Sequence, residues 1–181
     1  MSSVGSALVT WDEFLQMEDP EDGTRNELHD GEVVAVPPAR PIHIYIQHVL
    51  VDWLTSAARG RGSAAMEFPY RPAANLQFWY ADVAYLSNED WEMMRGQEYS
   101  VYAPQLIIEV LSPSNRPGKI RRQRVAALSA GTREFWVVNP DKRTIEVWVP
   151  GSPSYIYGAE DTVPVAVLLG AAFPVSKLFQ A

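Results

Sequence analysis

The 181-residue sequence contains no cysteine. This absence excludes a disulfide framework, a zinc site built from thiolates and a cysteine nucleophile. Long hydrophobic runs are also missing, because two prolines and a glycine interrupt the most apolar stretch, residues 163–175, which is shorter than the roughly 20 residues of a membrane span. Residues 1–10 lack the basic and then apolar order of a signal peptide. We therefore expect a soluble cytoplasmic protein with no membrane partner, folded as a single domain over residues 1–181.

Several well-known catalytic motifs are absent as well. The sequence has no glycine-rich phosphate loop, no His-Glu-x-x-His and no Gly-x-Ser-x-Gly. Nucleotide-binding, zinc-protease and serine-hydrolase functions of those types therefore have no support.

Basic residues are scarce but unevenly placed. The chain has 15 Lys and Arg against 22 Asp and Glu, a net charge of −7, which argues against a broad surface that coats nucleic acid. The segment 116–124 nevertheless contains no acid and five basic residues: Arg116, Lys119, Arg121, Arg122 and Arg124. This basic segment fits a confined anionic ligand, and the alternative is a solvated helix face.

The first third of the chain carries clear local signals. Thr10 to Glu13 have the spacing of a capping box, which predicts a short helix ending near Pro20. Asp30-Gly31 lies between two extended runs and predicts a hairpin over residues 25–36. Apolar residues at helical spacing then predict one long amphipathic helix over residues 41–60.

The remainder alternates between strand and helix signals. Apolar or alternating runs predict strands at residues 65–70, 76–86, 105–111, 134–138 and 144–149. A short polar helix is expected near residues 90–95, and one further strand in an irregular tail from residue 150. A helix entered through Asn115 and ending at Gly131 should face the core with Ile120, Val125 and Leu128 while its arginines face outward. This order predicts an α/β fold with a central mixed sheet flanked by helices.

Two acids lie inside strongly apolar strand segments. Asp82 is part of the run 78–85, and Glu109 is part of the run 106–111. A buried carboxylate is unfavourable unless it is paired, protonated or bound to a metal. Two carboxylates on neighbouring strands could share one Mg²⁺, which would suffice for phosphodiester chemistry. The alternative is that each acid pairs with an arginine or lies on an exposed face.

A third acid and three histidines are weaker candidates. Glu27 could approach the same place from the predicted hairpin, although a half-exposed strand acid is the simpler interpretation. We interpret His43 as a contact to substrate or to a metal ligand, and His29 and His48 as surface residues.

Five stretches of sequence together carry a family resemblance. They are Arg25-x-Glu27-Leu28-x-Asp30-Gly31-Glu32; Pro37-Pro38 followed by His43-x-x-Ile46; Asp82-Val83; Ile108-Glu109-Val110-Leu111-Ser112-Pro113-Ser114-Asn115; and Gly131-x-x-Glu134-Phe135-Trp136-x-Val138-x-Pro140. With these motifs the chain resembles the Uma-two family, also called domain of unknown function 820, of the PD-(D/E)XK nuclease superfamily. The resemblance extends from Trp11 to Phe179, and its most specific part is the run that begins at Glu109.

The resemblance implies a restriction-endonuclease-like core and a metal-dependent nuclease site. By residue-to-residue match, Asp82 and Glu109 would hold Mg²⁺ or Mn²⁺, and Glu27 would complete the set of acids. Nucleic acid, DNA in the first place, would be the partner, with His43, Arg121 and Arg122 as substrate contacts.

The sequence departs from the family pattern in the helix that follows. The family's Asp-x-x-x-Lys-x-x-x-Tyr falls on Lys119, Gln123 and Ala127. Tyr80-Ala81 also replaces the usual Arg-Pro before the aspartate, and Asn139 replaces an aspartate. Gln123 cannot supply a cation, but residues four apart share a helix face, so Lys119 could deliver its charge from one turn away.

Two functions of different kinds follow. The first is a Mg²⁺-dependent DNA endonuclease, with a homodimer as a further expectation because cutting two strands takes two sites. The second is a degenerate interaction module that keeps the nuclease fold but no longer cleaves. An exposed aromatic surface near Trp79, Tyr80 and Trp91 could form a dimer contact, although core filling is the simpler role for most of the six tryptophans.

Overall fold

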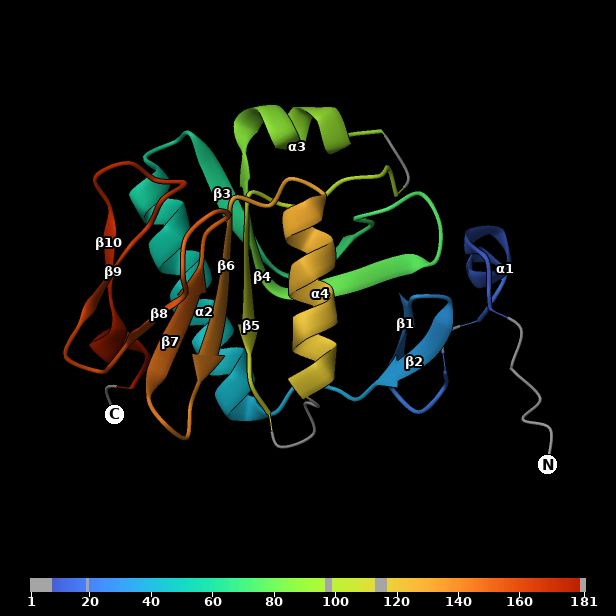
Figure 1. Ribbon diagram of the computed structural model, residues 1–181, viewed down its shortest axis with the longest axis horizontal. Coiled ribbons are helices and arrows are strands. Elements are labelled where there is room, and N and C mark those ends of the chain that lie inside the picture. Colours follow the sequence, from blue (N-terminus) through green and yellow to red (C-terminus); the bar gives the residue numbers. More distant parts are fainter. Residues whose placement is uncertain (1–7, 19, 97–98, 113–116, 180–181) are drawn as a thin grey trace.

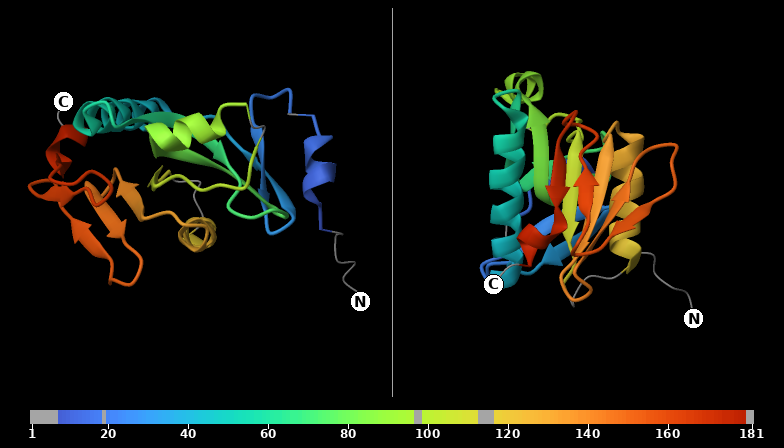
Figure 2. Two further views of the ribbon diagram at one scale, coloured as in Figure 1. Left: turned by 90° about the horizontal axis from the view of Figure 1, so that it is seen from above. Right: turned by 90° about the vertical axis from the view of Figure 1, so that its left-hand side faces the viewer.

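The computed structural model describes residues 8–18, 20–96, 99–112 and 117–179. These residues form a mixed sheet with strand order β2-β1-β4-β5-β6-β7-β8, and β3 pairs with β4 beside this path. Helices α2 and α4 cover opposite faces of the sheet (Figures 1 and 2). The predicted α/β fold with a mixed sheet flanked by helices is therefore confirmed.

The bounds of the described elements are, in chain order, α1 (Trp11–Leu15), β1 (Arg25–His29), β2 (Glu32–Val36), α2 (Pro41–Ala58), β3 (Gly62–Tyr70), β4 (Gln77–Ser87), α3 (Asn88–Met94), β5 (Leu106–Val110), α4 (Pro117–Ser129), β6 (Glu134–Asn139), β7 (Thr144–Trp148), β8 (Tyr155–Tyr157), β9 (Thr162–Pro164), β10 (Ala172–Pro174) and the 3-10 helix η1 (Val175–Leu178).

Local chemistry explains the elements that the sequence predicted. Thr10 and Glu13 form the expected capping box at the start of α1. Asp30 and Gly31 both have positive φ, 52° and 84°, as a two-residue hairpin turn between β1 and β2 requires. Helix α2 begins with a proline in its first turn and ends at Arg59 in the left-handed conformation.

Each face of the sheet carries a hydrophobic core. On one face, α2 packs Leu50 into a cluster that includes Trp136. On the other, α4 contributes Ile120 and Ala127. Strand β5 is buried along its whole length, so the sequence there is apolar, with Glu109 as the exception.

Several details differ from the sequence-based predictions. Helix α1 ends at Leu15, five residues before the expected end. Val125 was predicted to face the core but is 54% exposed, because the buried side of α4 carries Gln123 and Ala127 instead. The tail contains three short strands rather than one. Trp79 is fully buried, so the suggested exposed aromatic surface does not include it.

No helix within the described ranges has both the length and the apolar character that crossing a membrane requires.

Glu134 connects β6 to the C-terminal segment. Its Oε1 accepts a hydrogen bond from Trp136 Nε1 (2.8 Å) and its Oε2 accepts one from the Val167 amide (3.3 Å). Burial raises the pKa of this carboxyl, and the hydrogen bond from Trp136 partly opposes that. We expect Glu134→Ala to lower the free energy of unfolding by about 2–4 kcal/mol, because the buried Trp136 donor and the half-buried Val167 amide lose their acceptor. Urea unfolding measures this, and a loss below about 1 kcal/mol would contradict it.

Candidate active site

The site lies where β4 exchanges one neighbouring strand for another. On one edge β4 pairs with β1 at Phe78 and with β5 from Val83 onward. Between these two ladders the amide of Tyr80 donates to Glu27 Oε1 (3.2 Å) and the amide of Asp82 donates to Glu109 Oε1 (3.4 Å). Because backbone donors inside a fold need acceptors, carboxylates here replace the missing strand, which explains why acids interrupt apolar runs.

Asp82 is fixed by two contacts at one oxygen. Its Oδ2 accepts a hydrogen bond from the Val110 amide (2.6 Å) and lies 3.0 Å from His43 Nε2. The Asp82 side chain keeps 15% of its surface exposed, so it reaches the surface of the site. His43 is buried at the start of α2, and the predicted contact between His43 and a candidate metal ligand is present.

Glu109 is almost completely buried, with 4% exposed. In addition to the Asp82 amide, Gln123 Nε2 donates to its Oε1 at 2.8 Å. Burial raises the pKa of Glu109 well above its ordinary range, the negative charge of Asp82 raises it further, and the positive charge of Lys119 opposes both. Gln123 therefore occupies the position expected for the lysine as a neutral donor to Glu109.

Glu27 is buried to 1% exposure, contrary to the simpler interpretation of a half-exposed acid. Its Oε2 lies 2.6 Å from His29 Nε2 and 2.8 Å from Lys119 Nζ. Burial alone raises the pKa of Glu27, but the hydrogen bond from His29 and the charge of Lys119 outweigh it, so the pKa lies below its ordinary value. Glu27 is thus an ionised anchor for Lys119.

The surface assignment of His29 is wrong, whereas His48 is exposed as expected. The His29 ring stacks on Trp79 with the ring centroids 3.7 Å apart, and its other contact is Glu27. Glu27 lies two residues earlier on the same strand, whereas the fold brings Trp79 to His29, so the sequence near His29 did not reveal the ring that covers it.

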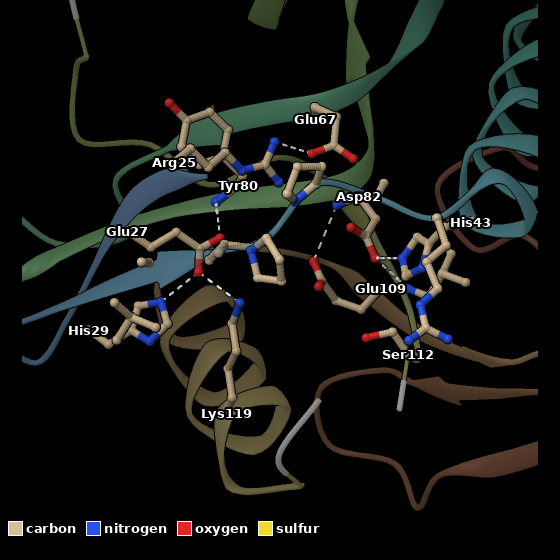
Figure 3. A pocket seen from close by; sticks show the side chains of 18 of the residues that line it. Arg25, Glu27, His29, His43, Glu67, Tyr80, Asp82, Glu109, Ser112 and Lys119 are labelled. Carbon is tan, nitrogen blue, oxygen red and sulfur yellow. Dashed lines mark hydrogen bonds and ion pairs between the residues drawn. The ribbon is translucent and has the colours of Figure 1, made fainter. Parts of the chain in front are cut away.

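These residues line one cavity of about 680 Å³. In Figure 3, Asp82 and Glu109 face the same space, Lys119 extends from α4 toward Glu27, and His43 reaches Asp82 from α2. Among the lining residues are five acids, namely Glu27, Glu32, Glu67, Asp82 and Glu109, and four permanently basic residues, namely Arg25, Arg40, Lys119 and Arg122. The acids therefore outnumber the cations in a cavity that would receive a phosphate.

The two candidate arginines of α4 occupy different places. Arg122 lines the main cavity and also a second hollow of about 640 Å³, whereas of these two hollows Arg121 lines only the second. Arg122 Nε lies 3.9 Å from Asp30 Oδ2, and both side chains are largely exposed. The basic segment thus connects the two hollows, while its first residue, Arg116, lies outside the described residues together with Asn115, Ser114 and Pro113.

Sequence reasoning missed four residues of the site: Arg25, Gln47, Glu67 and Tyr80. Arg25 pairs with Glu67, which also accepts a hydrogen bond from Gln47. The sequence did contain one signal for Arg25, because side chains of a strand alternate between its two faces. Arg25, Glu27 and His29 follow one another at intervals of two residues on β1. If Glu27 faces the cavity, Arg25 and His29 are therefore expected to face it as well.

The carboxylates of the site are suitable ligands for a hard cation such as Mg²⁺, but they are few. Among the described residues no group of three or more His, Asp or Glu side chains is arranged to hold a metal ion. Asp82 and Glu109 are two carboxylates, and Mg²⁺ is commonly held by one or two carboxylates together with water and phosphate oxygens. Burial first and the charge of Asp82 second raise the pKa of Glu109, and a cation bound by the two carboxylates would offset the repulsion between them.

A family model described as "Putative restriction endonuclease", Uma2, matches residues 11–176. The chain belongs to the Uma2 family. A solved structure described as that of "a putative nuclease belonging to DUF820 from Anabaena variabilis" is similar to this Uma2 protein with a TM-score of 0.81 at 23% sequence identity. The similarity covers 94% of this chain and 97% of that chain, and it shows a shared nuclease fold. No curated protein matches the chain.

Membership of the Uma2 family confirms the resemblance drawn from the motifs. Family membership does not assign roles to individual residues. In the structure, Asp82 and Glu109 are in contact, and Lys119 lies one helical turn before Gln123.

Proposed function

We propose that this Uma2 protein is a metal-dependent DNA endonuclease whose Asp82 and Glu109 hold Mg²⁺ or Mn²⁺. The observation that carries the proposal is the pair of carboxylates at the gap between β1 and β5, where each accepts an amide of the neighbouring strand and both line the same cavity. The protein would act as a single domain, and as a homodimer when it cuts both strands of a duplex.

A divalent cation supports this function in two ways. When bound, it supplies Lewis-acid activation of water and neutralises negative charge on the phosphate. Such a cation would offset the excess of acids over lysine and arginine side chains in the cavity. Asp82 and Glu109 are the residues that would hold it.

The neighbouring side chains orient these two acids. Gln123 and the Asp82 amide both donate to Oε1 of Glu109, so Oε2 is the oxygen that suits a cation. His43 and the Val110 amide hold Oδ2 of Asp82. Fixed ligands bind a metal with less loss of side-chain freedom.

Lys119 provides the cation that Gln123 cannot. Its ammonium stabilises charge that builds on the phosphate and orients the attacking water. Glu27 and, through Glu27, His29 hold Lys119 on the cavity side of α4. Arg121 and Arg122 bind the nucleic-acid backbone beside the cavity, and His43 adds a donor near the reacting phosphate.

The second candidate is an interaction module that has lost cleavage. The specific observation in its favour is Gln123, a neutral amide hydrogen-bonded to Glu109 where the family pattern has lysine. Cleavage of supercoiled plasmid and of single-stranded DNA, with Mg²⁺ or Mn²⁺, separates the two functions. Metal-dependent cutting by the folded protein supports the endonuclease, and intact DNA under every condition supports the module.

Metal binding has a consequence that does not depend on cleavage. We expect Mg²⁺ or Mn²⁺, at ten times its dissociation constant, to stabilise the fold by about 1.4 kcal/mol and to raise Tm by about 3–5 °C. Glu109→Gln should remove most of this shift, because it replaces one of the two charged ligands. Glu32→Gln is the matched control, since Glu32 is an exposed acid that lines the same cavity. Differential scanning calorimetry measures the shift, and equal shifts in both variants would exclude Glu109 as a ligand.

A further inference from the structure

Arg25 and Glu67 form an ion pair in the wall of the active-site cavity. Arg25 lies on β1 and Glu67 on β3, and both line the cavity that contains Asp82 and Glu109. In Figure 3 this pair is on one side of Glu109 and Lys119 is on the other. The cavity therefore has a cation on each side of its acids, and each cation has an acidic partner.

Glu67 is held in place on two sides. The buried amide of Gln47, on α2, donates to its Oε1, while Arg25 binds its Oε2. The backbone of Glu67 has a φ of 51°, a left-handed value that residues other than glycine rarely adopt. In the antiparallel pairing of β3 with β4, Glu67 falls opposite Asp82, between the pairs Met66–Val83 and Phe68–Ala81. This unusual conformation aims an acid into the cavity next to the candidate metal ligands.

The Arg25 side chain is held in position, but not all of its hydrogen-bond donors have partners among the described residues. Its guanidinium carbon lies 4.2 Å from the centre of the Tyr80 ring, so the side chain is stacked in one place. Its Nε is buried and has no hydrogen-bond partner among the described residues. A guanidinium has five N–H donors in a planar fork suited to phosphate oxygens. Within the described part of the chain the ion pair of Arg25 with Glu67 leaves part of that capacity unused.

We propose that Arg25 is a phosphate receptor for the nucleic-acid strand in this cavity, and that Glu67 is its resting partner, which the phosphate displaces. The inference rests on the proposed function for the nature of the ligand, and it adds a second, non-metal contact to the strand. Arg25 binds a backbone phosphate next to the one held near Asp82 and Glu109. Glu67 keeps the guanidinium oriented and neutralised while no strand is bound.

If Glu67 and a phosphate compete for Arg25, substitutions of Arg25 and of Glu67 should change the affinity for nucleic acid in opposite directions. Arg25→Gln should weaken binding of a fluorescein-labelled single-stranded oligodeoxynucleotide about tenfold or more, as expected for loss of a charge-assisted contact. It should also reduce the salt dependence of binding by about one phosphate contact. Glu67→Gln should tighten binding about three- to tenfold, because the phosphate no longer displaces an acid.

The test is a double-mutant cycle measured by fluorescence anisotropy, with Ca²⁺ in place of the catalytic ion. The gain in affinity from Glu67→Gln should fall below about twofold in the Arg25→Gln background. Glu32→Gln controls for the general removal of an acid from the cavity, and Arg25→Lys tests the planar fork while keeping the charge. A gain in affinity cannot arise from misfolding, and thermal unfolding checks the weaker binders.

The outcomes separate this inference from the cleavage activity. Tightening that requires Arg25 supports the inference, whether or not the protein cuts DNA. Equal tightening in both backgrounds, tightening of the same size in Glu32→Gln, or no binding by the wild type overturns it. Cleavage by a wild type whose variants show no such coupling would overturn the role of Arg25 and leave the endonuclease proposal standing.

Discussion

We expect Glu109→Gln to reduce metal-dependent cleavage of plasmid DNA at least about a thousandfold. The substitution keeps the size of the side chain and an oxygen that can accept the Asp82 amide and the Gln123 amide, but it removes the charge that would hold the cation. Loss of the several kcal/mol that a catalytic metal supplies corresponds to such a factor. Relaxation of supercoiled plasmid, followed over time with Mg²⁺ or Mn²⁺, measures the effect.

The same variant should be at least as stable as the wild type when no metal is present. Glu109 is buried, and both burial and the charge of Asp82 raise its pKa, so the ionised form destabilises the metal-free fold near neutral pH. Glu134→Gln is the matched control, because Glu134 is a buried strand acid outside the cavity and should retain cleavage. Undiminished metal-dependent cutting by Glu109→Gln would contradict its role as a ligand.

Local signals were sufficient to predict the fold. The Asp30-Gly31 turn, the proline at the start of α2 and the continuous apolar run of β5 each act within a few residues. They specify hairpin, helix and buried strand without information from distant parts of the chain. Boundaries that depend on packing, such as the early end of α1 and the three short strands in the tail, were not predictable in this way.

The two central acids were predictable because a carboxylate in a buried strand requires an explanation. The burial of Glu27 and His29 was not, since their partners Lys119 and Trp79 are far away in sequence. The same holds for the arrangement of α4, where the sequence pattern predicted that Val125 faces the core although it is exposed. A buried, hydrogen-bonded amide, such as that of Gln123, cannot be distinguished from a surface glutamine by sequence alone.

Lys119→Ala is expected to lower the cleavage rate about 100- to 1000-fold without preventing metal binding. The ammonium is the group that would stabilise charge on the reacting phosphate, and loss of one such donor has effects of this size. Lys142→Ala is a matched control, because Lys142 is an exposed lysine in the turn between β6 and β7. Single-turnover cleavage at saturating metal measures the rate, and the Tm shift with metal should remain.

Stability must be measured for the same variant, since Lys119 is the cation next to the buried Glu27. Its removal leaves Glu27 with the His29 ring and the Tyr80 amide, and we expect a decrease of about 1–2 kcal/mol in the free energy of unfolding. A decrease of this size leaves the protein folded under assay conditions. Full cleavage activity in Lys119→Ala would exclude the lysine from the mechanism.

A lysine introduced at position 123 tests whether Lys119 has taken over the role of the family's lysine or whether the site has lost its activity. Gln123 Nε2 lies 2.8 Å from Glu109 Oε1, so a lysine at position 123 would place its ammonium beside the same carboxylate. If Lys119 has taken over this role, Gln123→Lys should recover about tenfold or more of the activity lost in Lys119→Ala and change the wild type little. If the site has decayed, the wild type should be inactive, and the double variant Lys119→Asp/Gln123→Lys, which recreates the family's acid and lysine pattern, should gain metal-dependent cleavage. The activities of these variants therefore decide whether the catalytic charge of α4 has shifted from position 123 to Lys119 or has been lost.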